Sequence, residues 1–144
     1  MKGRSFIDTN VLVYTDDHDS PEKKHHALEF IAQARLGGNA VLSTQVLQEY
    51  FVTVTRKFGV AAPIARRKVE LFSRFNLVCI DLDTILGAVD LHRLHQFSFW
   101  DALIVRCAID AGCSVLYSED MQQGRKLNGL EFVNPFLSAS PSAT

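Results

Sequence analysis

Acidic side chains follow the apolar runs of this sequence, and together they could do metal chemistry. Carboxylates that gather without a neighbouring cation repel one another and raise one another's pKa values. A divalent cation relieves that repulsion, and carboxylate oxygens suit Mg²⁺ or Mn²⁺. One or two such ions can activate water and stabilise the charge on a phosphodiester during in-line attack. The acids in suitable places are Asp8, Glu49, Asp101 and Asp120.

Helix capping is the alternative explanation for two of these acids. Asp8 could cap a helix that begins near Asn10, and Ser98 to Asp101 fits the S-x-x-D pattern of a capping box. The carboxylate of Asp101 stands at the head of an apolar stripe, where its burial is costly unless something compensates it. Capping and metal binding are compatible, so both remain open at these positions.

The other two acids could be ordinary surface residues. Glu49 projects opposite the apolar face of its helix, and glutamate is seldom buried. Asp120 could be a turn residue, and Glu119 could substitute for it if the register of the loop is shifted. Only the joint placement of the four acids favours a metal site over separate surface roles.

An α/β fold is predicted from the alternation of short apolar runs with longer helix-patterned segments. The runs are typical of strands buried on both faces, which implies a mainly parallel sheet of four to five strands with helices on both faces. Sites in such sheets gather at the carboxyl ends of the strands. The predicted strands are 6–7, 40–42, 77–80, 114–117 and, more weakly, 132–133. The predicted helices are 21–37, 44–58, 61–75, 84–95 and 100–111.

Length and charge are those of one globular domain without an overall nucleic-acid signature. The 144 residues suffice to bury a core, and 47% of them are hydrophobic. Fifteen Lys and Arg nearly balance sixteen Asp and Glu, so any RNA-binding surface must be a local patch. The small polar residues of 138–144 predict a disordered tail.

Cysteine usage and hydropathy predict a cytoplasmic protein. Cys79, Cys107 and Cys113 each lie in an apolar run and form no C-x-x-C pair, so buried free thiols in a reducing compartment are expected. The N-terminal apolar run is too short for a signal peptide, and no run reaches membrane-spanning length. Glycine-rich nucleotide-binding motifs are absent from the sequence, which argues against a nucleotide cofactor.

The order and spacing of the motifs resemble the PIN-domain family, in particular the toxin ribonucleases of bacterial VapBC toxin–antitoxin pairs. The resemblance covers residues 5 to about 137 and predicts one PIN-like nuclease domain over 1–137. It implies a three-layer α/β/α sandwich, metal-dependent endoribonuclease activity, homodimers and neutralisation by a cognate antitoxin protein. The segments that carry it are Ile7-Asp8-Thr9-Asn10, Glu49, Phe99-Trp100-Asp101-Ala102-Leu103-Ile104, Leu116-Tyr117-Ser118-Glu119-Asp120-Met121 and Asn134-Pro135-Phe136.

The resemblance also implies roles for individual residues. The four acids match the family's acidic positions, which serve as the catalytic centre and as the ligands of Mg²⁺ or Mn²⁺. Thr9 and Asn10 match supporting positions beside the first acid, and the Ser118 hydroxyl matches a position that can orient a ligand or water. The matched acids are Asp8, Glu49, Asp101 and Asp120.

Basic and aromatic residues supply candidate contacts to RNA. Arg125 and Lys126 are candidate RNA-binding residues, because they follow the fourth acid closely and cations bind phosphates. Phe97, Phe99 and Trp100 could stack on bases, although packing in the core or at a dimer contact explains such aromatics better.

Two other classes of function fit part of the sequence. A binding module could keep this fold with a dispensable site, although the presence of all four acids disfavours it. A phosphohydrolase with an aspartate nucleophile would also have an acid after its first strand, but it usually needs a second Asp where Asn10 stands. The favoured hypothesis is therefore a metal-dependent endoribonuclease, the toxin of a type II toxin–antitoxin pair.

Overall fold

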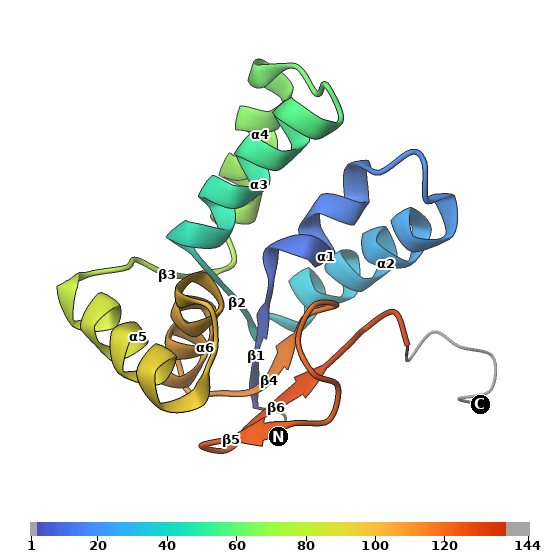
Figure 1. Cartoon of the computed structure of the whole chain (residues 1–144). Helices are drawn as coiled ribbons and strands as arrows, with labels where there is room; N and C mark the ends of the chain where they lie inside the picture. Colours follow the sequence, from blue (N-terminus) through green and yellow to red (C-terminus); the bar gives the residue numbers. More distant parts are fainter. Residues whose placement is uncertain (1–2, 138–144) are drawn as a thin grey trace.

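A computed structural model of the chain describes residues 3–137, which are built around a six-stranded sheet (Figure 1). The strand order is β3-β2-β1-β4-β6-β5, and every neighbouring pair is parallel except β5 and β6. The predicted mainly parallel sheet is therefore confirmed. The strands are β1 (Arg4–Ile7), β2 (Ala40–Ser43), β3 (Asn76–Val78), β4 (Cys113–Tyr117), β5 (Lys126–Leu127) and β6 (Leu130–Val133).

Helices cover both faces of the sheet, as the three-layer prediction requires. In Figure 1, α5 and α6 lie on one side of the sheet, α1 and α2 lie on the other, and the α3–α4 pair projects beyond its carboxyl edge. The helices are α1 (Thr9–Val13), α2 (Pro21–Gly37), α3 (Thr44–Lys57), α4 (Ala62–Phe72), α5 (Leu82–His95) and α6 (Phe99–Asp110), with a 3₁₀ turn η1 (Tyr14–Asp16) after α1.

The sixth strand is one more than the sequence predicted, and local turn chemistry explains it. Asn128 and Gly129 have φ angles of 50° and 80°, the left-handed conformation that a two-residue hairpin turn requires. This turn folds β5 back on β6 as an antiparallel pair. Since β5 has two residues, it carries no apolar alternation that could have revealed it.

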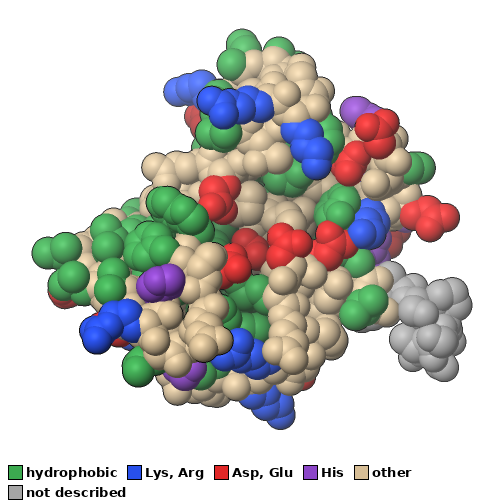
Figure 2. Space-filling view, in the orientation of Figure 1, with side chains coloured by type: hydrophobic (Ala, Val, Ile, Leu, Met, Phe, Trp, Pro, Cys, Tyr) green, Lys and Arg blue, Asp and Glu red, His purple; other side chains and the backbone are tan. Residues whose placement is uncertain are grey.

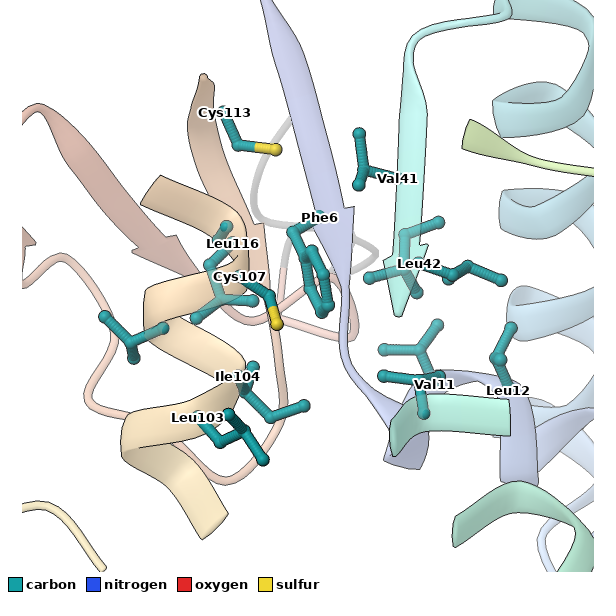
Figure 3. Close-up of a cluster of buried hydrophobic side chains, with 14 of the residues drawn as sticks. Phe6, Val11, Leu12, Val41, Leu42, Leu103, Ile104, Cys107, Cys113 and Leu116 are labelled. Carbon is teal, nitrogen blue, oxygen red and sulfur yellow. The ribbon is translucent and has the colours of Figure 1, made fainter. Parts of the chain in front are cut away.

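The core forms where the strands of the sheet meet α6 and α1. Phe6 of β1 is fully buried near Leu42 of β2 and Leu116 of β4 (Figure 3). Ile104 comes from α6 and Val11 from α1, so both helices close over the strand that ends at the candidate site.

The cysteines are free, but they are not all buried as the sequence predicted. Burial raises the pKa of Cys107 to about 12 and that of Cys113 to about 11, which keeps both thiols protonated. Cys79 is exposed, and the prediction is wrong there. The reason is that the edge strand β3 ends at Val78 and leaves Cys79 in the following loop.

Two surface features complete the fold. An apolar stripe remains exposed on α5, where Leu82, Ile85, Leu86 and Val89 follow helical spacing, and Figure 2 shows hydrophobic side chains gathered over this helix. Across residues 3–137, no helix combines the length and apolar character needed to cross a bilayer. The predicted tail, 138–144, lies outside the described residues.

Candidate active site

The site begins where β1 ends, at Asp8. This residue caps α1, since its Oδ1 accepts a hydrogen bond from the main-chain N–H of Thr9 at 2.7 Å. Its Oδ2 accepts from the Ser118 hydroxyl at 2.8 Å, and the residue is only 7% exposed. The capping prediction is thus confirmed, and the same carboxylate is fixed at the carboxyl edge of the sheet between β1 and β4.

The charge of Asp8 is disfavoured by its surroundings. The pKa of Asp8 is raised to about 7, mainly by burial and to a smaller extent by the nearby carboxylates of Glu49 and Asp101, while hydrogen bonds from Ser118 and Thr9 oppose the shift. Removal from water is therefore the main cause, and repulsion by other acids adds to it. A cation that paired with this group would offset both effects.

Glu49 is held in place from two sides and is not a freely solvated residue. The Thr9 hydroxyl donates to Glu49 Oε1 at 2.7 Å, and Gln45 Nε2 donates to Glu49 Oε2 at 3.1 Å. Gln45 is 4% exposed, and its Nε2 also lies 3.2 Å from the main-chain oxygen of Trp100. This amide thus joins α3 to the first turn of α6.

Gln45 is a site residue that the sequence analysis missed. The available signal was its position one turn before Glu49, on the same face of α3. Its Oε1 is buried and, among the described residues, lacks a hydrogen-bond partner.

Asp101 lies in the first turn of α6, half-buried beside the other acids. Ser98 caps the helix by accepting from the main-chain N–H of Asp101 at 3.1 Å, which confirms the predicted N-cap. Burial raises the pKa of Asp101, a hydrogen bond from Ser98 partly opposes the rise, and the charges of Asp120 and Glu49 add to it.

The turn after β4 is built around the buried hydroxyl of Ser118. This Oγ accepts from the main-chain N–H of Asp120 and from Asn10 Nδ2, both at 3.2 Å. The Asn10 side chain also donates to Asp120 Oδ2 at 3.1 Å and accepts from the main-chain N–H of Glu119 at 3.2 Å. Asn10 and Ser118 therefore fix the turn and the direction of Asp120.

Glu119 faces a different set of partners from Asp120. The Tyr14 hydroxyl donates to Glu119 Oε1 at 2.6 Å, and Lys23 of α2 forms an ion pair with its other oxygen. The charge of Glu119 is therefore already balanced, while Asp120 accepts only from a neutral amide among the described side chains. These contacts favour Asp120 as the fourth acid of the site.

The four candidate acids lack the cationic partner that Glu119 and Asp16 have. Among residues 3–137, none of the four pairs with Lys or Arg, whereas nearby Asp16 pairs with Lys68 at 2.8 Å. Asp8 interacts electrostatically with Glu49 and Asp101, and Asp101 interacts with Asp120. Figure 2 shows acidic side chains in a band across the hollow below the α3–α4 pair.

The donor chemistry of this acid cluster fits a hard divalent cation. Its carboxylates lack a Lys or Arg partner among residues 3–137, Asp8 is buried and Asp101 is half-buried, and such oxygen donors suit Mg²⁺ or Mn²⁺. In the described part of the chain, however, no three His, Cys, Asp or Glu side chains already converge as a ligand group. Charge repulsion acts against closer approach of these carboxylates, and a cation would reverse it.

An open cleft of about 720 Å³ adjoins the acids. Trp100 lines this cleft and is 61% exposed, so it does not pack in the core. A dimer contact through Trp100 stays a prediction. Phe97 and Phe99 do pack against the core, as expected. The lining side chains include Asn10, Gln45, Gln48, Glu49, Val52, Thr53, Lys57, Phe58, Trp100 and Asp120.

The candidate RNA-binding pair Arg125 and Lys126 lies away from the lining of this cleft. The Arg125 guanidinium stacks on Phe97, with its central carbon 4.6 Å from the ring centroid, and Lys126 belongs to the edge strand β5. Lys57, at the end of α3, is the only Lys or Arg among the described lining residues. The predicted RNA-binding role of Arg125 and Lys126 remains a prediction.

Comparison with known proteins defines the class of protein to which this fold and site belong. Residues 5–126 match the PIN domain family model, and the chain therefore belongs to the PIN-domain family. The sequence has no match among curated proteins.

Solved structures with the same fold include three related to toxin–antitoxin systems. VapC20 of Mycobacterium tuberculosis, a sarcin–ricin loop cleaving toxin, has a TM-score of 0.68 and 20% identity over 81% of this chain and 89% of its own. A toxin–antitoxin complex from Klebsiella pneumoniae has a TM-score of 0.64 and 20% identity, and the match covers 91% of this chain and 97% of the other. The structure of VapBC2 from Rickettsia felis, bound to a promoter DNA fragment, has a TM-score of 0.60 and 20% identity, and the match covers 89% of this chain and 96% of the other. At this identity the likeness establishes the fold.

Proposed function

We propose that this PIN-domain protein is a metal-dependent endoribonuclease and the toxin of a type II toxin–antitoxin pair. The observation that carries the proposal is a set of four carboxylates beside an open cleft, each interacting electrostatically with at least one other and none paired with Lys or Arg in residues 3–137. Membership of the PIN-domain family supports nuclease chemistry at this position. The fold likeness to VapC20 and to the other two structures supports the toxin role.

The residues of the site would have two kinds of role, metal binding and the orientation of the metal-binding carboxylates. Asp8, Glu49, Asp101 and Asp120 would hold Mg²⁺ or Mn²⁺, and the bound ion would activate water and balance the charge on the phosphodiester. Thr9 and Gln45 orient the two oxygens of Glu49. Ser118 orients Asp8 and, together with Asn10, the turn that carries Asp120.

The partners we propose are a cognate antitoxin protein and a second copy of this chain. The antitoxin is supported by two of the similar structures, which are a toxin–antitoxin complex and a VapBC assembly. The homodimer is supported by the exposed apolar stripe of α5, since contiguous apolar patches of this kind mark interaction surfaces. The proposed location is the cytoplasm, whose reducing conditions suit three free cysteines.

Incubation of purified protein with labelled mixed RNA tests the nuclease proposal. Cleavage is expected with Mg²⁺ or Mn²⁺ and is expected to stop when EDTA is added. A folded wild-type protein that binds RNA in the presence of Mg²⁺ but leaves it intact would instead support a binding module.

A further inference from the structure

We propose that the cleft along α3 is a track for an unpaired RNA strand, in which Trp100 stacks on a nucleobase beside the acids and Lys57 holds a phosphate farther along. The inference deepens the proposed ribonuclease function and rests on it. It assigns substrate contacts to two residues that the nuclease chemistry itself does not use.

Trp100 is fixed at the acidic end of the cleft. It precedes Asp101 in the chain, and its main-chain oxygen accepts from Gln45, the amide that also holds Glu49. Phe99 supports the indole from one side, with ring centroids 5.1 Å apart in an edge-on arrangement. The indole nevertheless remains 61% exposed and lines the cleft.

An exposed indole beside a nuclease centre suits a nucleobase that has left its helix. Protein contacts to unpaired RNA stack splayed-out bases on aromatic rings, and every base has a face that can stack. A base held on Trp100 would bring its own phosphates near the carboxylates. The substrate segment would therefore be a single strand or a loop.

The lining residues of α3 extend the cleft away from the acids. Gln45, Glu49 and Val52 follow the spacing of one helix face, Lys57 lines the cleft at the end of the helix, and Gln45 to Lys57 spans roughly 18 Å of helix axis. That length exceeds one nucleotide, so the cleft is long enough for a short strand.

Lys57 supplies the one positive charge among the described residues that line the cleft. Lys57 is exposed and makes no ion pair among the described residues, in contrast to Lys23 and Lys68. Figure 2 shows Lys and Arg side chains over the far part of the α3–α4 pair, apart from the acidic band. Lys57 follows Glu49 by about two turns of α3, so a phosphate can bind there while the acid cluster stays available for the metal ion, although Asp17 and Glu119 also line the cleft.

The single tryptophan of the sequence makes the stacking directly measurable. Trp100 emission would be followed by stopped flow in Mg²⁺ after mixing with a short single-stranded RNA, its duplex form, or an abasic strand of equal length. We expect saturable quenching by the single strand and at least about tenfold weaker binding of the other two. Cleavage of the same RNA without a change in emission would overturn the track and leave the nuclease function standing. Quenching without cleavage would support the track and refute the nuclease.

Variants separate RNA contact from other roles of these residues. Trp100→Ala should raise the KM for single-stranded RNA about tenfold, and Trp100→Phe should restore most of the loss. Lys57→Ala should weaken binding and lower the salt dependence by about one phosphate contact, whereas Arg67→Ala, an exposed cation outside the cleft, should change neither. An altered oligomeric state of Trp100→Ala with unchanged RNA affinity would assign Trp100 to a dimer contact and overturn the proposal.

Discussion

The Ser118 hydroxyl donates a hydrogen bond to Asp8 Oδ2 at 2.8 Å, joining residues 110 positions apart in the sequence. The parallel pairing of β1 with β4 makes this contact, because it brings the ends of the two strands to the same edge of the sheet. The chain runs from β1 to β2 on one side and returns to β4 on the other, so this edge is the point where strand order reverses. Ligand sites of open α/β sheets form at such points.

Loss of the Ser118 hydroxyl should destabilise the protein and raise the pKa of Asp8 further. Ser118→Ala removes a buried hydrogen bond from a carboxylate, and we expect a loss of about 1–3 kcal/mol in unfolding free energy. Denaturant unfolding measures it, and Ser118→Thr should recover part of the loss. The matched control is Ser114→Ala, an exposed serine of β4. Equal effects of the two alanine variants would contradict the role of Ser118.

The stability of the metal-free protein should fall as the pH rises toward neutrality. The folded-state pKa of Asp8 is about 7, above the unfolded value of 3.8, so the folded protein holds a proton that the unfolded chain has lost. Between these values the unfolding free energy should drop by up to about 1.4 kcal/mol per pH unit from this group. Thermal or denaturant unfolding in EDTA measures the slope.

Asp8→Asn provides the comparison for this pH dependence. Its side chain cannot ionise, so the slope between about pH 4 and pH 7 should flatten and the variant should be more stable than the wild type at pH 8. Mg²⁺ should stabilise the wild type more at pH 8 than at pH 5, because it binds the ionised carboxylate. An identical pH profile for the two proteins would show that Asp8 titrates normally.

Gln45 should position the metal-binding carboxylates without binding the metal itself. Gln45→Ala removes the amide that joins Glu49 to the first turn of α6, and we expect the apparent Mn²⁺ affinity in RNA cleavage to fall by about 10–100-fold. The control is Gln33→Ala, an exposed glutamine of α2. A loss of thermal stability with unchanged Mn²⁺ affinity would reduce Gln45 to a structural residue.

Asp120 and Glu119 should respond differently to neutralisation. Asp120→Asn removes a charge of the acid cluster and should abolish most cleavage, whereas Glu119→Gln acts on a carboxylate already balanced by Lys23. Glu119→Gln should retain most of the activity and lose some stability. Cleavage rates at saturating Mg²⁺ distinguish the two variants. A greater loss of activity in Glu119→Gln than in Asp120→Asn would mean that Glu119 is the metal ligand.

Much of the fold could be predicted from the sequence because apolar runs and helix caps are local signals. Pro21 in the first turn of α2 and Ser98 at the N-cap of α6 are found where they were expected. The hairpin of β5 was missed because its signal is a turn, and Cys79 was misjudged because an apolar run does not reveal that its strand lies at an edge.

The acids of the site could also be proposed from the sequence, but their environment could not. The choice of Asp120 over Glu119 depends on Tyr14 and Lys23, which are distant in sequence. The contact of Gln45 with Trp100 joins residues 55 positions apart, and the exposure of Trp100 follows from tertiary packing. Such long-range contacts have no local pattern.

The most direct test of the acidic centre compares RNA cleavage by the wild type, Asp8→Asn and Glu22→Gln under single-turnover conditions in Mg²⁺. Glu22 is an exposed acid of α2 outside the cleft and serves as the matched control. We expect Asp8→Asn to lose at least about 100-fold in rate while remaining folded, and Glu22→Gln to match the wild type. Cleavage by Asp8→Asn at the wild-type rate, or wild-type cleavage that persists in EDTA, would contradict a metal-dependent centre at these acids.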